Sequence, residues 1–290
     1  MNGYDVIVIF GPTGSGKTDL SIELAKRIGG EIINLDSMQV YREIEIGTAK
    51  PTPPERSIVP HHLFDIVSVA DDFTVADYQK LARQTIQAIK SRGKKPILVG
   101  GTGLYLSSLY YDFTFRTATD RNEKVPVSEQ ALREWEGKVD IHNPRRLQRA
   151  LRTGQVYDKA ERVPSDLRML IVWPDWPRDE LHRRINRRVD QMLERGLMEE
   201  VRALEEKFSL AGTSSARQGI GYKELMAYFA GETDLETATE LIRIHTRQYA
   251  KRQITWVKNQ YPKVHRLDAT LGVEAMVEEI IYLEALSYED

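Results

Sequence analysis

The sequence contains no cysteine, which excludes disulfide bridges, thiolate metal sites and cysteine nucleophiles from the 290-residue chain. It also has no apolar run close to the roughly 20 residues that a membrane-spanning helix needs, and no basic, cleavable leader precedes the first apolar segment. Neither charge is in large excess, because the formal net charge is −2; this excludes a uniformly basic nucleic-acid binder but allows local basic stripes. We therefore expect a cytoplasmic protein that does not contact a membrane.

Residues Gly11–Thr18 match the phosphate-binding pattern G-x-x-x-x-G-K-[ST]. The apolar run Val6–Phe10 precedes them and the amphipathic run Asp19–Ile28 follows, so strand, loop and helix come in the required order. Backbone N–H groups and the positive end of the helix dipole bind phosphate oxygens in such a loop. The lysine adds a charge, and the threonine hydroxyl can bind Mg²⁺. The residues predicted to hold a di- or triphosphate are Gly11, Thr13, Gly14, Ser15, Gly16, Lys17 and Thr18, with Thr18 as the metal ligand.

Buried strands are predicted for the apolar runs at 31–35, 96–99 and 167–173, with a helix at 75–92 that opens on a capping box of Thr74 and Asp77. Strands alternating with helices predict an α/β fold, a P-loop core built on a doubly wound parallel sheet. Later helical patterns cover 178–204, 235–259 and 273–286.

One stretch departs from the alternation of strands and helices. Residues 114–165 lack buried-strand runs, carry many charges and contain short helical patterns near 128–136 and 144–152. We predict a mostly helical domain, 114–165, inserted into a core domain formed by 1–113 and 166–290.

Two polar residues follow predicted strands at the edge of the sheet where ligands bind in open parallel sheets. Asp36 follows the second strand, where it could be a catalytic carboxylate or equally a helix N-cap. Thr102 lies in the glycine-rich turn Gly100–Tyr105, where missing side chains would let a ligand approach the backbone and Thr102 would present a hydroxyl and N–H to the phosphate site. The pair His61 and His62 has no third ligand at metal-site spacing, which favours a structural role.

Three helical stretches carry basic faces. Residues 145, 149 and 152 are arginines on one helical face, which favours contact with a polyanion over a solvated surface. Arg178–Leu204 is the most basic stretch and could clamp phosphates as a lid or line a nucleic-acid channel. Arg243, Arg247 and Lys251 recur every four residues, close to Trp256, which suits contact with RNA.

Taken together, these motifs resemble the bacterial tRNA dimethylallyltransferases, also called tRNA isopentenyltransferases. The segments that carry the resemblance span the chain: Gly11–Thr18, Asp36–Arg42, Gly47–Pro51, His61–Asp65, Gly100–Tyr105, Arg146–Leu151, Gly219–Glu224 and Arg247–Trp256. The resemblance implies transfer of the dimethylallyl group from dimethylallyl diphosphate to N6 of adenosine 37, beside the anticodon of tRNA, with release of diphosphate. It also implies a Mg²⁺ cofactor, and we expect a monomer.

The resemblance also implies roles for individual residues. The phosphate loop would hold the diphosphate of the prenyl donor, and Asp36 would be the general base on the adenine amino group. Thr102 would bond the bridging oxygen of the leaving diphosphate and Arg217 its charged end. The residues that would hold the flipped-out adenosine are Asp36, Ser37, Met38 and Gln39; those that would grip the anticodon stem-loop are Gln148, Arg149, Ala150, Leu151, Arg152, Arg247, Lys251 and Arg252.

Two features of the insertion depart from the family pattern: Asp140 runs directly into Ile141 where a longer stretch is usual, and Arg152 stands where glutamate is usual. They bear on tRNA contacts of the insertion and not on the transfer centre. A P-loop kinase of a small molecule or nucleotide is the main alternative, with the same loop binding ATP and Asp36 activating a hydroxyl. A non-catalytic RNA-binding protein with a relict phosphate loop is the second.

Overall fold

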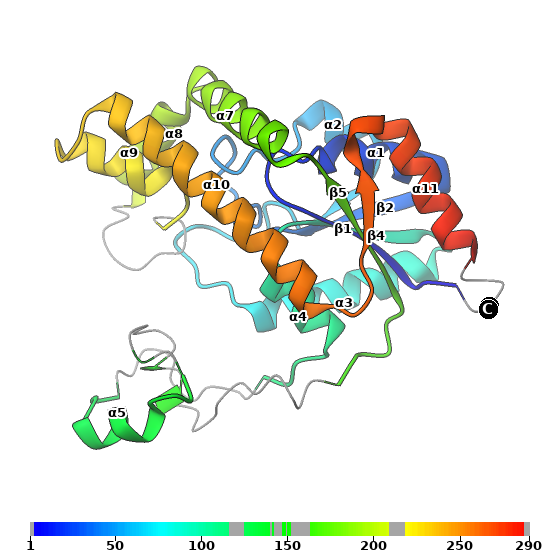
Figure 1. The fold of residues 1–290 in the computed structure, drawn as a ribbon, viewed down its shortest axis with the longest axis horizontal. Helices are drawn as coiled ribbons and strands as arrows, with labels where there is room; N and C mark the ends of the chain where they lie inside the picture. The colour runs from blue at the N-terminus through cyan, green and yellow to red at the C-terminus, as the bar shows by residue number, and fades with distance from the viewer. Residues whose placement is uncertain are drawn as a thin grey trace. The chain divides into compact units, whose positions relative to one another are not determined.

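The computed structural model describes residues 3–115, 125–139, 141, 147–148, 150–151, 163–208 and 218–286 (Figure 1). The chain divides into two compact units, one formed by Met1–Tyr110 with Ser165–Asp290 and the other by Tyr111–Pro164. We call the first the core and the second the insertion, and describe each by itself. In the described parts of the chain, no helix is both long and apolar enough to cross a bilayer.

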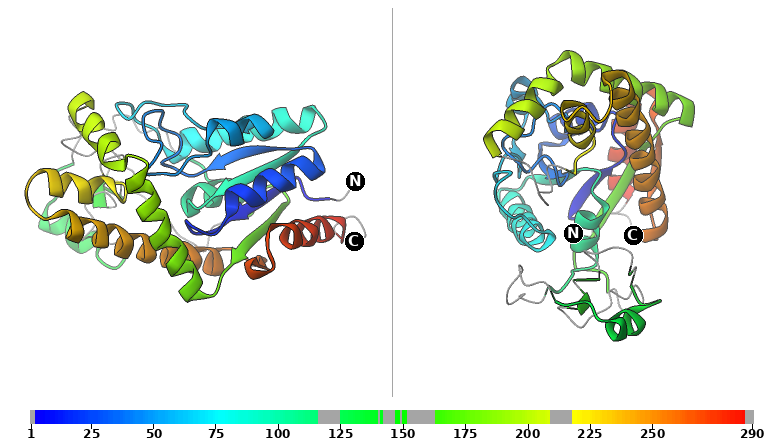
Figure 2. Two further views of the ribbon diagram at one scale, coloured as in Figure 1. Left: turned by 90° about the horizontal axis from the view of Figure 1, so that it is seen from above. Right: turned by 90° about the vertical axis from the view of Figure 1, so that its left-hand side faces the viewer.

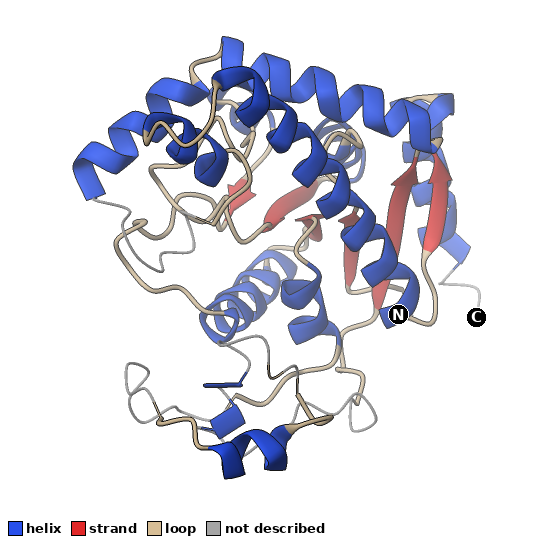
Figure 3. Ribbon diagram, turned by 60° about the vertical axis from the view of Figure 1, so that its left-hand side comes forward, coloured by secondary structure: helices blue, strands red, loops and turns tan. Residues whose placement is uncertain are grey.

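The described part of the core contains one parallel sheet, drawn in red in Figure 3. Its strands are β1 (Val6–Phe10), β2 (Gly30–Leu35), β3 (His61–His62), β4 (Lys95–Gly100), β5 (Met169–Asp175) and β6 (His265–Asp268), in the order β3-β2-β4-β1-β5-β6. Strand β1 pairs with β4 on one side and β5 on the other, and all five of its residues are buried. The predicted doubly wound parallel sheet is confirmed; β3 and β6 are strands that the apolar pattern did not predict.

Helices cover both faces of this sheet. Those of the core are α1 (Lys17–Ile28), α2 (Pro53–Ile58), α3 (Val75–Ser91), α4 (Gly103–Tyr110), α7 (Arg178–Glu194), α8 (Leu197–Phe208), α9 (Tyr222–Phe229), α10 (Leu235–Gln260) and α11 (Val273–Leu286). Helices α1 and α11 contact each other on one face, and α3 and α4 contact each other on the opposite face (Figures 1 and 2). Helix α10 packs against α4, α7 and α9.

The helix boundaries follow from local chemistry. Helix α3 begins with the predicted capping box, in which the Thr74 and Asp77 side chains each accept the other's backbone N–H. The long helix expected over 178–204 is instead two helices, because Gly196 adopts a φ of 98° between α7 and α8. A left-handed backbone is open to glycine and ends the α-helical hydrogen-bond ladder there.

The described residues of the insertion contain helix α5 (Glu129–Trp135), capped by the Ser128 side chain. Trp135, Leu147 and Ala150 form a small buried cluster. Gln148 bonds both backbone groups of Val125, accepting from its N–H at 3.0 Å and donating to its carbonyl at 2.8 Å. These contacts join the described segments of the insertion to one another. Arg149 and Arg152 lie outside the described residues, as does most of the helical pattern predicted at 144–152.

Candidate active site

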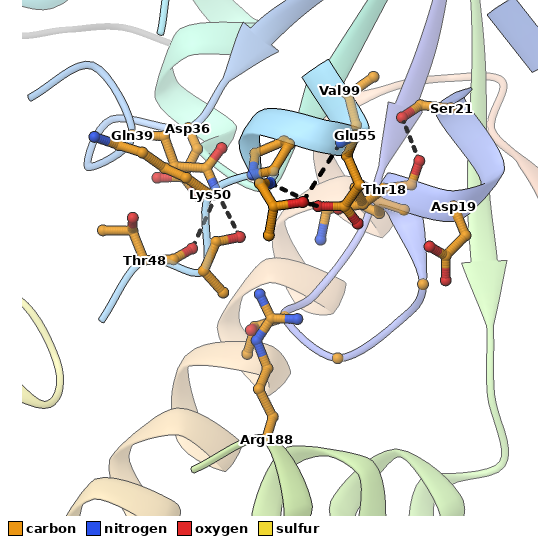
Figure 4. Close-up of a pocket in the computed structure, with 18 of the residues that line it drawn as sticks. Thr18, Asp19, Ser21, Asp36, Gln39, Thr48, Lys50, Glu55, Val99 and Arg188 are labelled. Carbon is orange, nitrogen blue, oxygen red and sulfur yellow. Dashed lines mark hydrogen bonds between the residues drawn. The ribbon is translucent and has the colours of Figure 1, made fainter. Parts of the chain in front are cut away.

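A cavity of about 430 Å³ opens in the core where β1, β2 and β4 end at their carboxyl sides. The phosphate loop, the turn after β2, the segment 48–52, helix α7 and helix α10 all contribute to its walls. Figure 4 shows Arg188 rising from α7 toward the cavity, with Asp36, Gln39 and Lys50 to one side and Thr18 and Asp19 to the other. The sheet topology therefore brings together residues that lie far apart in the sequence.

The phosphate loop has the backbone that its glycines predict. Gly14 and Gly16 have φ angles of 78° and 84°, a left-handed conformation that directs successive N–H groups toward one side. Five of the seven predicted phosphate ligands line the cavity: Thr13, Gly14, Gly16, Lys17 and Thr18. The other two have structural roles, because the Gly11 N–H donates to the Gly100 carbonyl at 3.1 Å and the buried Ser15 hydroxyl donates to the Pro12 carbonyl at 2.8 Å.

The outer side of the loop is held by two side chains next to β5 and on α7. Trp176 donates its indole N–H to the Ser15 carbonyl at 3.0 Å, and Arg184 donates Nε–H to the Gly14 carbonyl at 2.8 Å. The Arg184 guanidinium also stacks over the Trp176 ring, 4.3 Å from its centroid. These contacts occupy carbonyl groups on the outer side of the loop, while the Ser15 N–H donates within the loop to the Pro12 carbonyl at 3.3 Å.

Lys17 and Arg188 make the cavity strongly electropositive. Burial and, to a lesser extent, the nearby Arg188 charge lower the pKa of Lys17 to about 7, although Asp36 opposes the shift. Burial also lowers the pKa of Arg188, whose Nε is buried and makes no hydrogen bond. Burial removes both cations from water, and their charges repel each other. A bound anion would offset both costs, so the pair indicates an anion-binding site.

One face of α7 supplies this cavity wall. Arg184, Arg188, Gln191 and Arg195 recur at helical spacing along it, and each lines the cavity. Arg183 points elsewhere: it is exposed and pairs with Glu180 at 2.6 Å. Of the two roles predicted for this arginine-rich helix, the arrangement favours a phosphate clamp.

Asp36 is not the N-cap of a helix; it caps a turn at the edge of the main cavity, and its catalytic role stays a prediction. Its Oδ1 accepts the Met38 N–H at 2.9 Å, which closes a turn in the manner of a cap. No helix follows that turn in the described chain, and Asp36 also lines the cavity that Lys17 lines. A carboxylate in this position can accept a proton from a group bound next to the phosphate loop.

Thr102 lies beside the Asp36 turn. Its hydroxyl oxygen accepts the Ser37 N–H at 2.9 Å, and it bonds the Tyr249 side chain. The expected presentation of its N–H to a phosphate was wrong, because that N–H donates to the Leu35 carbonyl at 3.1 Å. The hydroxyl also donates to Ser37 Oγ at 3.3 Å, and Thr102 lines the smaller cavity next to the Asp36 turn and not the main cavity.

The glycines of the turn after β4 make room for the protein itself more than for a ligand. A Cβ on Gly100 would lie 2.2 Å from the Leu35 carbonyl oxygen, and one on Gly101 would lie 2.0 Å from Gln253 Nε2. Gln253 instead donates to the Gly101 carbonyl at 2.8 Å. Backbone and α10 thus fill the space that side chains would take, while Gly100 itself lines the main cavity; close approach of a ligand there stays a prediction.

A second, smaller cavity of about 220 Å³ adjoins the Asp36 turn. It is lined mainly by aromatic and aliphatic side chains: Ser37, Met38, Tyr41, Phe73, Val75, Thr102, Leu104 and Tyr105. Thus two of the four residues predicted to hold adenosine, Asp36 and Gln39, line the main cavity, and the other two line this one.

The basic stripe predicted on α10 is divided. Arg243 pairs with Asp190 of α7 at 2.5 Å, and Arg247 donates to Asn186 at 2.7 Å and to Glu240 at 3.0 Å. Lys251 and Arg252 are exposed. The first half of the stripe therefore joins α10 to α7, and the second half faces solvent.

Two further predictions concern the histidine pair, of which His61 lines the main cavity, and Arg217. His62 bonds Glu31 at 2.6 Å and His61 bonds the Val59 carbonyl at 2.8 Å, which supports the structural role expected for the pair. Within the described ranges, no cluster of three or more His, Asp or Glu residues could hold a metal ion. Arg217 lies outside the described residues.

Sequence reasoning missed several residues of the main cavity as individual ligands: Arg188, Tyr249, Gln253 and Lys50. The arginine-rich helix indicated that some of its arginines could bind an anion, but the sequence did not show that Arg188 is on the face that lines the cavity. Tyr249 and Gln253 lie four residues apart on α10, a spacing that places them on one helical face.

Comparison with known proteins agrees with this geometry. A family model described as IPP transferase matches residues 39–260. A tRNA dimethylallyltransferase of Latilactobacillus sakei subsp. sakei (strain 23K) is 42% identical over 287 residues, covering 90% of this chain and 91% of the relative.

Two solved structures are similar as well. The crystal structure of a full-length tRNA isopentenylpyrophosphate transferase from Bacillus halodurans has a TM-score of 0.78 at 36% identity, covering 98% of this chain and 96% of that one. A eukaryotic dimethylallyltransferase, captured in crystallographic snapshots of its action on tRNA, has a TM-score of 0.76 at 32% identity, covering 91% and 73%. These similarities favour prenyl transfer over the kinase alternative. The chain belongs to the IPP transferase family, that of the tRNA dimethylallyltransferases.

Proposed function

We propose that the main cavity binds dimethylallyl diphosphate and that the enzyme transfers its dimethylallyl group to N6 of adenosine 37 in tRNA. Membership of the family makes the chain a tRNA prenyltransferase. The observation that carries the proposal is the shared cavity of Asp36 and Lys17, because it joins a carboxylate base to a phosphate site. A kinase would bind ATP on the same loop, but the family relationship and the basic groups for RNA favour the prenyl donor.

The transfer needs a base and a site for the leaving group. N6 of adenine attacks C1 of the dimethylallyl group, the C–O bond breaks, and diphosphate leaves with the bonding electrons. The N6 proton passes to Asp36, since an exocyclic amine is a weak nucleophile unless a base accepts its proton. The Thr102 hydroxyl would contact the bridging oxygen of the leaving diphosphate, and Arg217 would contact its charged end.

The phosphate loop is suited to the charge that develops on the diphosphate. Its N–H groups, Lys17 and Arg188 are donors fixed before the reaction begins, so little reorganisation is needed as the C–O bond breaks. Thr18 lines this cavity, and its hydroxyl would hold Mg²⁺ together with oxygens of the substrate, because this ion commonly binds through one or two protein oxygens, substrate phosphates and water. Bound there, it would neutralise charge on the leaving group.

The tRNA would present the adenosine out of its stack. Base-modifying enzymes extrude their target base because the reacting atom is otherwise inaccessible. The aromatic lining of the second cavity suits an adenine ring, which Ser37 and Met38 would contact; Asp36 precedes them in the chain and lines the main cavity. Stacking on aromatic side chains and contacts to exposed base edges are the usual means of reading single-stranded RNA.

Basic residues would bind the anticodon stem-loop. The exposed Lys251 and Arg252 are candidates on α10, and the segment Gln148–Arg152 is the candidate in the insertion. Arg247 would contribute mainly by fixing α10 on α7. Because tRNA is the substrate, we expect the enzyme to act in the cytoplasm, and as a monomer.

The direct test is incubation with radiolabelled dimethylallyl diphosphate and an anticodon stem-loop containing A37, followed by nucleoside analysis. We expect label on N6 of A37 and released diphosphate. Asp36→Asn keeps an oxygen to accept the Met38 N–H but lacks the base, so it should bind the stem-loop normally and lose most turnover. Asp72→Asn, an exposed aspartate, is the matched control. Label absent with the parent enzyme, or near-parent turnover by Asp36→Asn, would contradict the proposal.

A further inference from the structure

A carboxylate on α8 is held by four donors from outside its own helix. Glu200 Oε2 accepts the N–H groups of Glu45 and Ile46 at 2.9 and 2.7 Å. Its Oε1 accepts the Gly47 N–H at 3.0 Å and the Tyr222 O–H at 2.6 Å. Three consecutive backbone N–H groups and a phenol thus converge on one side chain. Hydrogen bonds to an ionised carboxylate are shorter and stronger than those between neutral groups.

The fit around Gly47 shows how closely this loop approaches the helices. A Cβ on Gly47 would lie 2.4 Å from Tyr222 Oη and 2.6 Å from two ring carbons. Tyr222 begins α9 and is itself buried, so its ring has little freedom to move aside. Burial and the nearby Glu200 carboxylate raise the pKa of Tyr222, which keeps its hydroxyl a donor. Glycine at 47 is therefore required by the contact.

The other side of the same loop forms a wall of the main cavity. Thr48, Ala49 and Lys50 line it. The Thr48 carbonyl accepts from the Gln39 side-chain amide at 3.0 Å, and Gln39 also lines the cavity. Lys50 is buried and pairs with Asp65, which fixes the end of the loop. The loop 45–50 is thus bonded to α8 and α9 on one side and to the Asp36–Gln39 turn on the other.

We infer that Glu200 is a positioning residue for substrate binding, acting through loop 45–50 on the cavity wall and on Gln39. The inference rests on the proposed function for the identity of the substrate. Glu200 does not line the cavity, and the groups proposed to carry the chemistry, Lys17, Asp36 and Thr102, are not on the loop. Loss of the clamp should therefore weaken substrate binding more than it slows the bound complex.

The variant Glu200→Gln tests this with little change in shape. One of its terminal atoms becomes a donor facing donor N–H groups, so the loop loses at least part of its anchorage. We expect the KM for dimethylallyl diphosphate to rise about tenfold while kcat stays within about threefold of the parent value. Glu199→Gln changes an exposed neighbour on the same helix and should alter neither constant. Tyr222→Phe removes one donor of four and should have an intermediate effect.

Two further measurements separate positioning from general support of the fold. Gly47→Ala disturbs the same contact from the loop side and should reproduce the KM increase. Amide hydrogen exchange of residues 45–47 should be faster in Glu200→Gln and unchanged in Glu199→Gln, whatever the substrate is. A lower Tm with parent KM, or parent exchange rates at 45–47, would overturn the inference. Failure of the parent enzyme to use dimethylallyl diphosphate would instead refute the proposed function, and the exchange result would still decide whether Glu200 holds the loop.

Discussion

Asn34 holds Asp36 by both of its backbone polar groups. The Asn34 side chain accepts the Asp36 N–H at 2.8 Å and donates to the Asp36 carbonyl at 3.0 Å. It donates to the Leu63 carbonyl at 3.0 Å as well, and the Tyr78 hydroxyl donates to the Asn34 carbonyl at 2.8 Å. Because Asn34 is fully buried, the turn that carries the candidate base is fixed from within the core.

Replacing Asn34 by alanine should therefore affect both stability and turnover. The half-buried backbone N–H and carbonyl of Asp36 would lose their partners, which costs about 1–3 kcal/mol of unfolding free energy. A displaced carboxylate lowers kcat while leaving the phosphate loop intact. Urea unfolding and steady-state kinetics measure the two effects, with exposed Asn259→Ala as control. An Asn34→Ala enzyme with parent kcat would show that Asp36 does not depend on this support.

The lowered pKa of Lys17 predicts a pH dependence of anion binding. Its folded-state pKa of about 7 lies below the ordinary 10.5, so the unfolded chain holds this proton more tightly. Lys17 therefore lowers the free energy of unfolding fully below about pH 7. This penalty fades as the pH rises from about 7 toward 10.5, the pKa of the lysine in the unfolded chain. A bound diphosphate favours the charged amine, so its binding takes up a proton above pH 7.

Calorimetric titration with inorganic diphosphate tests this. The affinity of the parent enzyme should fall more steeply than that of Lys17→Met between about pH 6 and about pH 8.5, because the ligand's own ionisation is common to both. Buffers of different ionisation enthalpy should reveal the proton uptake in the parent only. Parallel pH profiles for the two proteins would mean that Lys17 stays charged throughout.

Arg188 predicts opposite effects on stability and binding. Removing a buried cation whose Nε has no partner relieves desolvation and its repulsion with Lys17, so Arg188→Met should raise the Tm. Losing a charged donor to diphosphate should weaken binding about 10- to 100-fold, equivalent to about 1.5–3 kcal/mol. Exposed Arg183→Met on the same helix should do neither. Unchanged diphosphate affinity in Arg188→Met would show that Arg188 does not bind the diphosphate.

The division of the basic stripe on α10 predicts which of its residues control the salt dependence of stem-loop binding. Replacing Lys251 and Arg252 together by glutamine should weaken stem-loop binding and reduce the slope of log Kd against log salt by about 0.7–0.9 for each cation. Arg247→Gln should mainly lower the Tm, since it breaks contacts to Asn186 and Glu240. Exposed Lys80→Gln on α3 is the control. A slope unchanged by the double substitution would show that Lys251 and Arg252 are solvated surface residues that do not contact the RNA.

The sequence predicted the parts of the site that depend on local pattern and sheet topology. Gly11–Thr18 is recognisable because glycine, lysine and threonine have fixed offsets, and Asp36 reaches the same edge because it follows a parallel strand. Strands β1, β2, β4 and β5 and the longer helices followed from apolar periodicity. Strands β3 and β6 did not, because β3 consists of two histidines and only Leu267 of the four residues of β6 is both apolar and buried.

Tertiary packing determined the remaining features. Helix α7 has arginines at 183, 184, 187 and 188, and its pattern alone does not say that Arg188 faces Lys17 while Arg183 pairs with Glu180. The α10 stripe had the right period, but Arg243 has its partner on another helix, Asp190. The glycines after β4 likewise accommodate Gln253, a residue about 150 positions away in the chain.

The hydrogen bond between the Ser165 N–H and the Tyr110 carbonyl, 2.7 Å long, joins the two points where the chain leaves and re-enters the core. The sheet, the phosphate loop and Asp36 are therefore complete without passing through Tyr111–Pro164, which is a side branch of the chain. Such a layout lets the branch shorten, lengthen or change sequence while the strand register stays as it is. The RNA contacts proposed for that branch could then change independently of the prenyl-transfer chemistry.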